Sequence, residues 1–82
     1  MRLKDVTRRF DSSKFYKGKY KKFVCHVNYS SNNDSWYYCI DSNDERDIRY
    51  NSLWDEVEFK TQEECVIACQ KYIDEIIRSR KE

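Results

Sequence analysis

Four cysteines are the residues of this chain with the most chemistry to offer. Cys65 and Cys69 are four residues apart, so on a helix both sulfurs would leave the same face. That placement suits two bridges to other elements better than one bridge within the helix. Cys25 and Cys39 complete a set that is even in number and lacks the two-residue knuckles of zinc ribbons. In a chain of 82 residues, this favours two disulfides and an oxidising compartment, with metal binding or free thiols as the alternatives.

A second candidate site is the segment 14–23, in which lysines are interleaved with aromatic residues. Ammonium groups beside rings suit an ion channel or other protein receptor, a sulfated polysaccharide, or a nucleic acid. A net charge of +1 argues against nucleic acid. The plainer alternative is a solvated strand whose rings pack inward and whose lysines point outward. The candidate contact residues are Lys14, Tyr16, Lys17, Lys19, Tyr20, Lys21 and Lys22.

The other potentially reactive side chains give no indication of catalysis. His26 is the single histidine, and one histidine without a free cysteine gives no nucleophilic pair or triad. The acids in residues 41–47 lack the glycine of an EF-hand loop, so we expect a solvated loop there. Trp54 stands beside acids and is the aromatic residue most expected to be exposed as a partner contact. We therefore expect no enzyme activity, no metal and no other cofactor.

Charge is distributed unevenly along the chain. Residues 1–22 carry nine Lys or Arg and two acids, for a charge of +7, whereas residues 23–64 carry three Lys or Arg and ten acids, for −7. We interpret residues 1–22 as a basic N-terminal arm. The arm either lies across the acidic body or offers a basic face to an acidic partner.

These side chains must be positioned by few elements. Aromatic and β-branched residues predict a strand over 15–29, and a Ser/Asn/Asp cluster over 30–34 predicts a turn. Residues 35–40 read as the returning strand, which puts Cys25 and Cys39 on the two arms of a hairpin. A polar loop is expected over 41–51 and a brief strand or bridge over 53–59.

The C-terminal helix is the most clearly predicted element. Thr61 followed three residues later by Glu64 forms a capping box, in which each side chain can bond the other's backbone N–H. A stripe of apolar residues with helical period follows from Cys65 to Ile77. We therefore predict a helix from residue 62 to about residue 78.

The run from Phe59 to Cys69 has the pattern Phe-x-Thr-x-x-Glu-Cys-x-x-x-Cys. It resembles the C-terminal block of the Kunitz/BPTI family, and residues 36–39 look like part of the family's aromatic hairpin. The resemblance implies an α+β fold over residues 23–82: a small disulfide-stapled Kunitz-like domain with a long antiparallel β-hairpin and a C-terminal α-helix. It also implies two disulfides, Cys39 with Cys65 and Cys25 with Cys69.

The chain departs from the inhibitors of that family where they contact proteases. It has four cysteines rather than six, and it lacks the Gly-Pro-Cys-Lys/Arg-Ala reactive segment. A rigid loop lowers the entropic cost of binding, so the loss of its bridge argues against standard inhibition. The chain is similar instead to the non-inhibitory Kunitz-like proteins of venoms and of tick saliva. That likeness implies a secreted protein that modulates a host ion channel or another host protein.

Two alternatives remain open for function. One is serine protease inhibition through the N-terminal arm, with Arg8, Arg9 or Lys14 in the specificity pocket, and the other is binding of heparan sulfate. Asn28 and Asn33 begin N-glycosylation tripeptides, which agrees with secretion. No apolar run has signal-peptide or membrane-span length. We expect an extracellular monomer without membrane insertion, a mature chain with an initiator Met supplied for expression.

Overall fold

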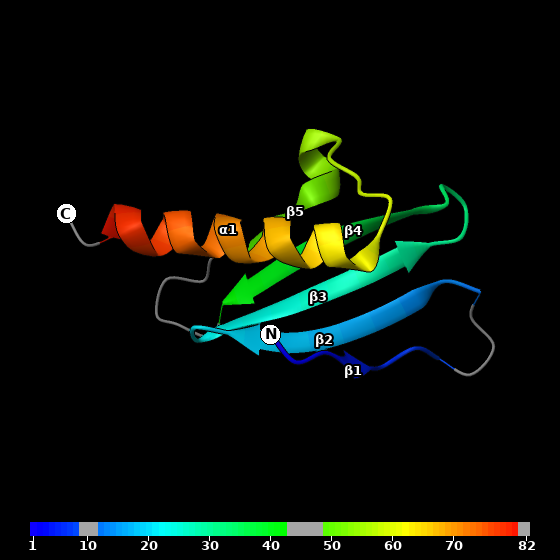
Figure 1. Ribbon diagram of the computed structural model, residues 1–82, viewed down its shortest axis with the longest axis horizontal. Coiled ribbons are helices and arrows are strands. Elements are labelled where there is room, and N and C mark those ends of the chain that lie inside the picture. The colour runs from blue at the N-terminus through cyan, green and yellow to red at the C-terminus, as the bar shows by residue number, and fades with distance from the viewer. Residues whose placement is uncertain (9–11, 43–48, 81–82) are drawn as a thin grey trace.

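The computed structural model describes residues 1–8, 12–42 and 49–80, and it contains a five-stranded antiparallel sheet with one long helix along one face (Figure 1). The strands follow the order of the sequence across the sheet, so each pairs with its neighbours along the chain. The domain is therefore α+β, as the sequence predicts. Its elements are β1 (Lys4–Asp5), β2 (Lys14–Tyr20), β3 (Phe23–Ser30), β4 (Ser35–Ser42), β5 (Arg49–Asn51), the short 3-10 helix η1 (Ser52–Asp55) and α1 (Gln62–Arg80).

β2 and β3 form a hairpin where the sequence predicts one continuous strand over residues 15–29. Lys21 and Lys22 connect the two strands, with φ values of 47° and 73°. Two central residues in the left-handed region are typical of type I′ turns, whose twist matches that of the flanking strands. The prediction of one strand is wrong because lysine, unlike Asn or Gly, carries no turn signal.

The predicted hairpin that carries Cys25 and Cys39 is present as β3 and β4. The two strands pair in continuous register along their whole length, and Asp34 closes the predicted turn with a φ of 50°. Directly opposed residues lie on the same face of a sheet. Cys25 therefore shares one face with Ile40, and Cys39 shares the other face with His26.

The core lies between α1 and the face of the sheet that carries Cys25, here named the covered face. Alternate residues of β3 and β4 point into it, and Cys65, Cys69 and Ile73 meet them from the buried stripe of α1. No helix of the described residues lies on the opposite side of the sheet (Figure 1), here named the open face. The buried core residues are Phe23, Cys25, Val27, Tyr38, Ile40, Cys65, Cys69 and Ile73.

α1 begins at the predicted residue and extends two residues beyond the predicted end. The Thr61 hydroxyl accepts a hydrogen bond of 3.2 Å from the Glu64 N–H, which is the N-cap half of the predicted capping box. Glu63 and Glu64 lie in the first turn, where carboxylates interact favourably with the helix dipole. No helix within the described residues combines the length and apolar character needed to cross a membrane.

The connection between β4 and α1 is more regular than the sequence predicts. Part of the expected loop over residues 41–51 forms β5, which pairs with the end of β4. η1 follows, with the Asn51 side chain accepting a hydrogen bond of 2.9 Å from the Leu53 N–H. The expected bridge before the helix is present: Phe59 and Trp36 exchange backbone hydrogen bonds of 2.7 and 2.8 Å.

Residues 1–22, the predicted basic arm, supply β1 and β2, so this range and residues 23–82 contribute to one sheet. Met1 and Leu3 also pack against the core cluster. Gly18 of β2 permits this approach, because a Cβ atom there would lie 2.9 Å from both the Arg2 carbonyl oxygen and the Met1 Cγ. A larger residue at this position would push the N-terminal residues off the sheet.

All four cysteines carry free thiols in the structure. The α+β class is thus established by the backbone alone, and the two disulfides remain a prediction. So does the Kunitz-like assignment that implies them.

Candidate functional site

The lysine–aromatic segment 14–23 divides between the two faces of the sheet. Tyr16 and Tyr20 pair with core residues of β3 and so belong to the covered face, whereas Lys17 and Lys19 belong to the open face. This division follows from strand alternation, which sends successive side chains to opposite sides. A partner that binds one face of the sheet therefore cannot contact Lys17 or Lys19 together with Tyr16 or Tyr20.

The open face instead brings Lys17 and Lys19 together with Lys4, a residue that no sequence pattern indicates as part of a site. Lys4 lies directly opposite Lys17 in the pairing of β1 with β2, and all three lysines are exposed. They border a hollow of about 540 Å³, here named the basic groove. Its lining residues are Lys4, Val6, Lys17, Gly18, Lys19 and Val24.

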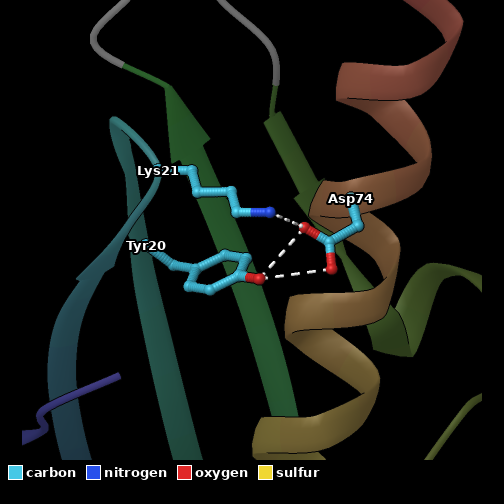
Figure 2. Close-up of polar contacts among 3 residues, drawn as sticks. All are labelled: Tyr20, Lys21 and Asp74. Carbon is cyan, nitrogen blue, oxygen red and sulfur yellow. Dashed lines mark hydrogen bonds and ion pairs between the residues drawn. The ribbon is translucent and has the colours of Figure 1, made fainter.

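Tyr20 and Lys21 are engaged within the molecule, as Figure 2 shows. The Lys21 ammonium lies 2.7 Å from a carboxylate oxygen of Asp74 on α1, and the Tyr20 hydroxyl donates to the same carboxylate at 3.0 and 3.2 Å. The hydrogen bond with Lys21 is the main cause of a lowered pKa at Asp74, and the same bond raises the pKa of Lys21. These two predicted contact residues thus join the β2–β3 turn to the helix.

The remaining basic candidates are dispersed. Lys14 begins β2 opposite Tyr29 and is exposed, and Lys22 is exposed in the β2–β3 turn. Arg8 is exposed three residues after β1, whereas Arg9 lies outside the described residues. Because the backbone of Lys14 is held in the sheet, this residue is not on a free arm.

Trp54 belongs to a separate surface on the side of the sheet that carries α1. Its side chain is 67% exposed and meets the edge of Tyr50 at a centroid distance of 6.1 Å. Tyr50 in turn stacks on Tyr72 of α1 at 4.3 Å and hydrogen-bonds the Asp55 carboxylate at 2.5 Å. That hydrogen bond is the main cause that raises the pKa of Tyr50 to about 12. Trp54 is thus an exposed ring that packs on Tyr50 and lies outside the basic groove.

Three of the cysteines lie in the core, and the fourth, Cys39, lies on the open face. The thiols of Cys25 and Cys69 hydrogen-bond each other in the core, and this bond followed by burial raises the pKa of Cys69. Burial raises the pKa of the Cys65 thiol to about 12. Cys39 is half-buried on the open face, where burial also raises its pKa. A reactive cysteine needs a lowered pKa and access to solvent, and no cysteine of this chain combines the two.

The two potential glycosylation sites differ in access. Asn33 is exposed in the β3–β4 turn and donates a hydrogen bond of 3.2 Å to Glu58. Asn28 is only 6% exposed on β3, so the folded chain offers no room for a glycan there. Asn28 is one of the open-face residues whose environment the sequence alone does not reveal, because its burial depends on neighbouring strands.

The described residues contain no group of three or more side chains suited to hold a metal ion. No family model matches the chain, and no curated protein or solved structure matches it. The candidate site therefore rests on the geometry of the basic groove.

Proposed function

We propose that the protein is a secreted, non-enzymatic binding module whose basic groove holds an acidic segment of a host protein, either an ion channel or a regulatory protein. The observation that supports this proposal is the direct opposition of Lys4 and Lys17 across β1 and β2. Like charges in this position repel each other. Within the described residues neither lysine forms a salt bridge, so a carboxylate from a partner would replace repulsion with attraction.

The spacing of the lysines suggests the shape of the acidic segment. Neighbouring strands lie about 4.8 Å apart, and alternate residues along one strand lie about 6.8 Å apart. Lys4 and Lys17 have the first relation, and Lys17 and Lys19 have the second. An extended peptide carries its alternate side chains at that same second spacing. We therefore expect a partner segment with acids at alternate positions.

A sulfated polysaccharide is the second candidate. An ammonium group is a compact charge that meets an anion from any direction, and the basic groove, at about 540 Å³, has room for sulfo groups. Val6 and Val24 also line the groove. Their side chains form no hydrogen bonds, so they do not favour a peptide over a polysaccharide.

The Kunitz-like scaffold and its bridges are part of the same proposal. The contact between the Cys25 and Cys69 thiols supports the Cys25–Cys69 disulfide. The Cys39–Cys65 disulfide would need β4 to change locally, because Cys39 lies on the open face and Cys65 lies in the core. Secretion follows from the disulfides, since such bridges persist in oxidising compartments.

Binding to two defined probes tests the proposal. The first is a labelled peptide with glutamate at alternate positions, measured by fluorescence anisotropy at low and high salt, and the second is a heparin column eluted with salt. Replacing Lys4, Lys17 and Lys19 together by Gln should weaken peptide binding roughly tenfold, because each exposed ion pair contributes about 0.2–1 kcal/mol. The matched control replaces three exposed lysines elsewhere, Lys14, Lys22 and Lys60.

The two variants remove the same charge, so a general electrostatic effect would weaken binding equally in both. Equal losses would contradict the basic groove as the site. Binding to heparin alone, with a loss confined to the groove variant, would favour the polysaccharide over the acidic protein.

A further inference from the structure

A row of polar side chains crosses the open face in direct register. Successive strand pairings from β1 to β4 align its members, which are Lys4, Lys17, His26 and Cys39. Side chains in direct opposition have Cβ atoms about 4.5–5.5 Å apart. Lys17 therefore has Lys4 as its neighbour on one side and the half-buried His26 as its neighbour on the other. His26 thus lies at the border of the basic groove.

His26 has charged neighbours on both sides. Lys17 and Lys19 face it from β2, Asp41 faces it from β4, and Arg8 lines the same hollow of about 420 Å³. Burial lowers the pKa of His26, and Lys17 lowers it further, whereas Asp41 opposes this shift. The chain without a ligand therefore keeps this imidazole mainly neutral at neutral pH.

The other titratable groups beside His26 are uncharged at neutral pH. Cys39 lies directly opposite it on β4, and Tyr37 lies diagonally opposite. Burial raises the pKa of the Cys39 thiol, and burial is also the largest cause of the raised pKa of the Tyr37 hydroxyl. Asp41 pairs with Arg49 at 3.6 Å, and α1 covers the opposite face of the sheet. The strongest charge acting on His26 is thus that of Lys17.

A bound acidic segment changes this environment. A carboxylate that pairs with Lys17 offsets the lysine charge and places a negative charge close to the imidazole. An opposite charge within about 4–6 Å favours the charged form of a titratable group. Protonation of His26 in turn adds a cation to the row that holds the segment. Binding and protonation therefore favour each other, as linkage requires.

We propose, on the basis of the proposed function, that His26 makes the basic groove a pH-dependent site, which holds its acidic segment more tightly at mildly acidic pH than at neutral pH. Histidine is the side chain whose charge ordinarily changes between about pH 5 and 8. The complex takes up the proton more readily than the free chain. Affinity therefore rises as the pH falls through the histidine pKa of the complex, and it levels off below the histidine pKa of the free chain.

Fluorescence anisotropy with the labelled peptide that carries glutamate at alternate positions tests this inference at pH 7.5 and 5.5, at one salt concentration. We expect roughly threefold tighter binding at pH 5.5, the size of one added ion pair that is partly exposed. His26→Gln should remove this gain, whereas the variant that replaces Lys14, Lys22 and Lys60 should keep it. The glutamates of the peptide lose little charge in this range, and any loss would weaken binding.

NMR of the imidazole ring measures the linkage directly. The chain has a single histidine, so its ring signals identify themselves, and their pH titration can be followed with and without saturating peptide. The titration midpoint should move upward in the complex by roughly half a pH unit, which is the same threefold factor.

The outcomes separate this inference from the proposed function. Absence of peptide binding at both pH values would contradict the proposed function and the inference together. Binding without the gain, a gain that persists in His26→Gln, or an unchanged titration midpoint would overturn the role of His26 alone.

Discussion

His26 connects the stability of the sheet to pH. Its imidazole is half-buried on the open face, close to Lys17, which lies directly opposite on β2, and to Asp41. Burial and Lys17 hold its pKa below the usual value of 6.5, so the folded state binds a proton less readily than the unfolded chain. The free energy of unfolding should therefore fall as the pH drops below about 6.5 and on through the folded-state pKa.

Urea denaturation from pH 7.5 to pH 5 measures this effect as a decrease of the midpoint. Because the chain has a single histidine, His26→Gln should flatten the dependence in this range. The carboxylates titrate mainly below it. Parallel curves for the wild type and the variant would show that His26 is not the group responsible.

The amino-acid sequence shows which residue types could form a site, but it does not show which residues become neighbours in the fold. Lys17 and Lys19 are selected because they alternate with aromatic residues, and both lie on the open face. Lys4 is not selected, because only the register of β1 against β2 brings it opposite Lys17. Lys21 is selected as a partner contact, yet it pairs with Asp74, 53 residues away. Contacts of this kind depend on tertiary structure, which no local pattern reports.

At the scale of elements, the Asp74 carboxylate joins α1 to the β2–β3 turn. Asp74 has a lowered pKa and its partner Lys21 a raised one, each chiefly through their shared hydrogen bond. The contribution of Asp74 to stability is thus present above about pH 3.8 and is lost as the pH falls through the folded-state pKa. The contribution of Lys21 is present below pH 10.5 and is lost as the pH rises through its raised pKa.

Asp74→Asn should therefore lower the thermal midpoint at pH 7 and have a smaller effect near pH 2. Thermal unfolding followed by circular dichroism at both pH values measures the difference. Glu75→Gln, one residue further along α1 and exposed, is the control and should have little effect. A decrease of equal size at both pH values would mean that the Asp74 charge is not what joins the turn to the helix.

The predictability of the elements follows the strength of their local signals. α1 is predicted to within two residues because Thr61 caps it and one apolar stripe continues along its length. The β3–β4 turn is predicted because Asn and Asp tolerate left-handed backbone. The β2–β3 turn is missed because Lys22, at a φ of 73°, is a residue that rarely adopts this conformation. β5 is missed because it has only three residues, all polar or aromatic, and because its strand conformation depends on pairing with β4.

At the scale of the whole molecule, the core is small and a cross-link would matter. Oxidation of the Cys25–Cys69 pair would close a loop of tens of residues, worth about 3–4 kcal/mol in the chain-entropy model. We expect peptide mapping of air-oxidised protein to find this link. The thermal midpoint should then rise by roughly 10–30 °C over the reduced protein.

The reduced double variant Cys25→Ala/Cys69→Ala separates the loss of packing from the loss of the bridge. This variant should be less stable than the reduced wild type. Air oxidation should not produce in it the rise in thermal midpoint that is expected from the Cys25–Cys69 disulfide. A Cys25–Cys39 link instead would require a different register of β3 and β4, since the two residues lie on opposite faces.

The strand order of the sheet has a consequence for how the chain assembles. Each strand pairs with one that is adjacent in the sequence, and local pairings of this kind form quickly. α1 is the exception, because it packs on β3 and β4 although it is synthesised well after them. Until α1 docks, the Cys25 thiol is exposed to solvent on the uncovered sheet. Docking therefore closes a time window in which an oxidant can reach that sulfur.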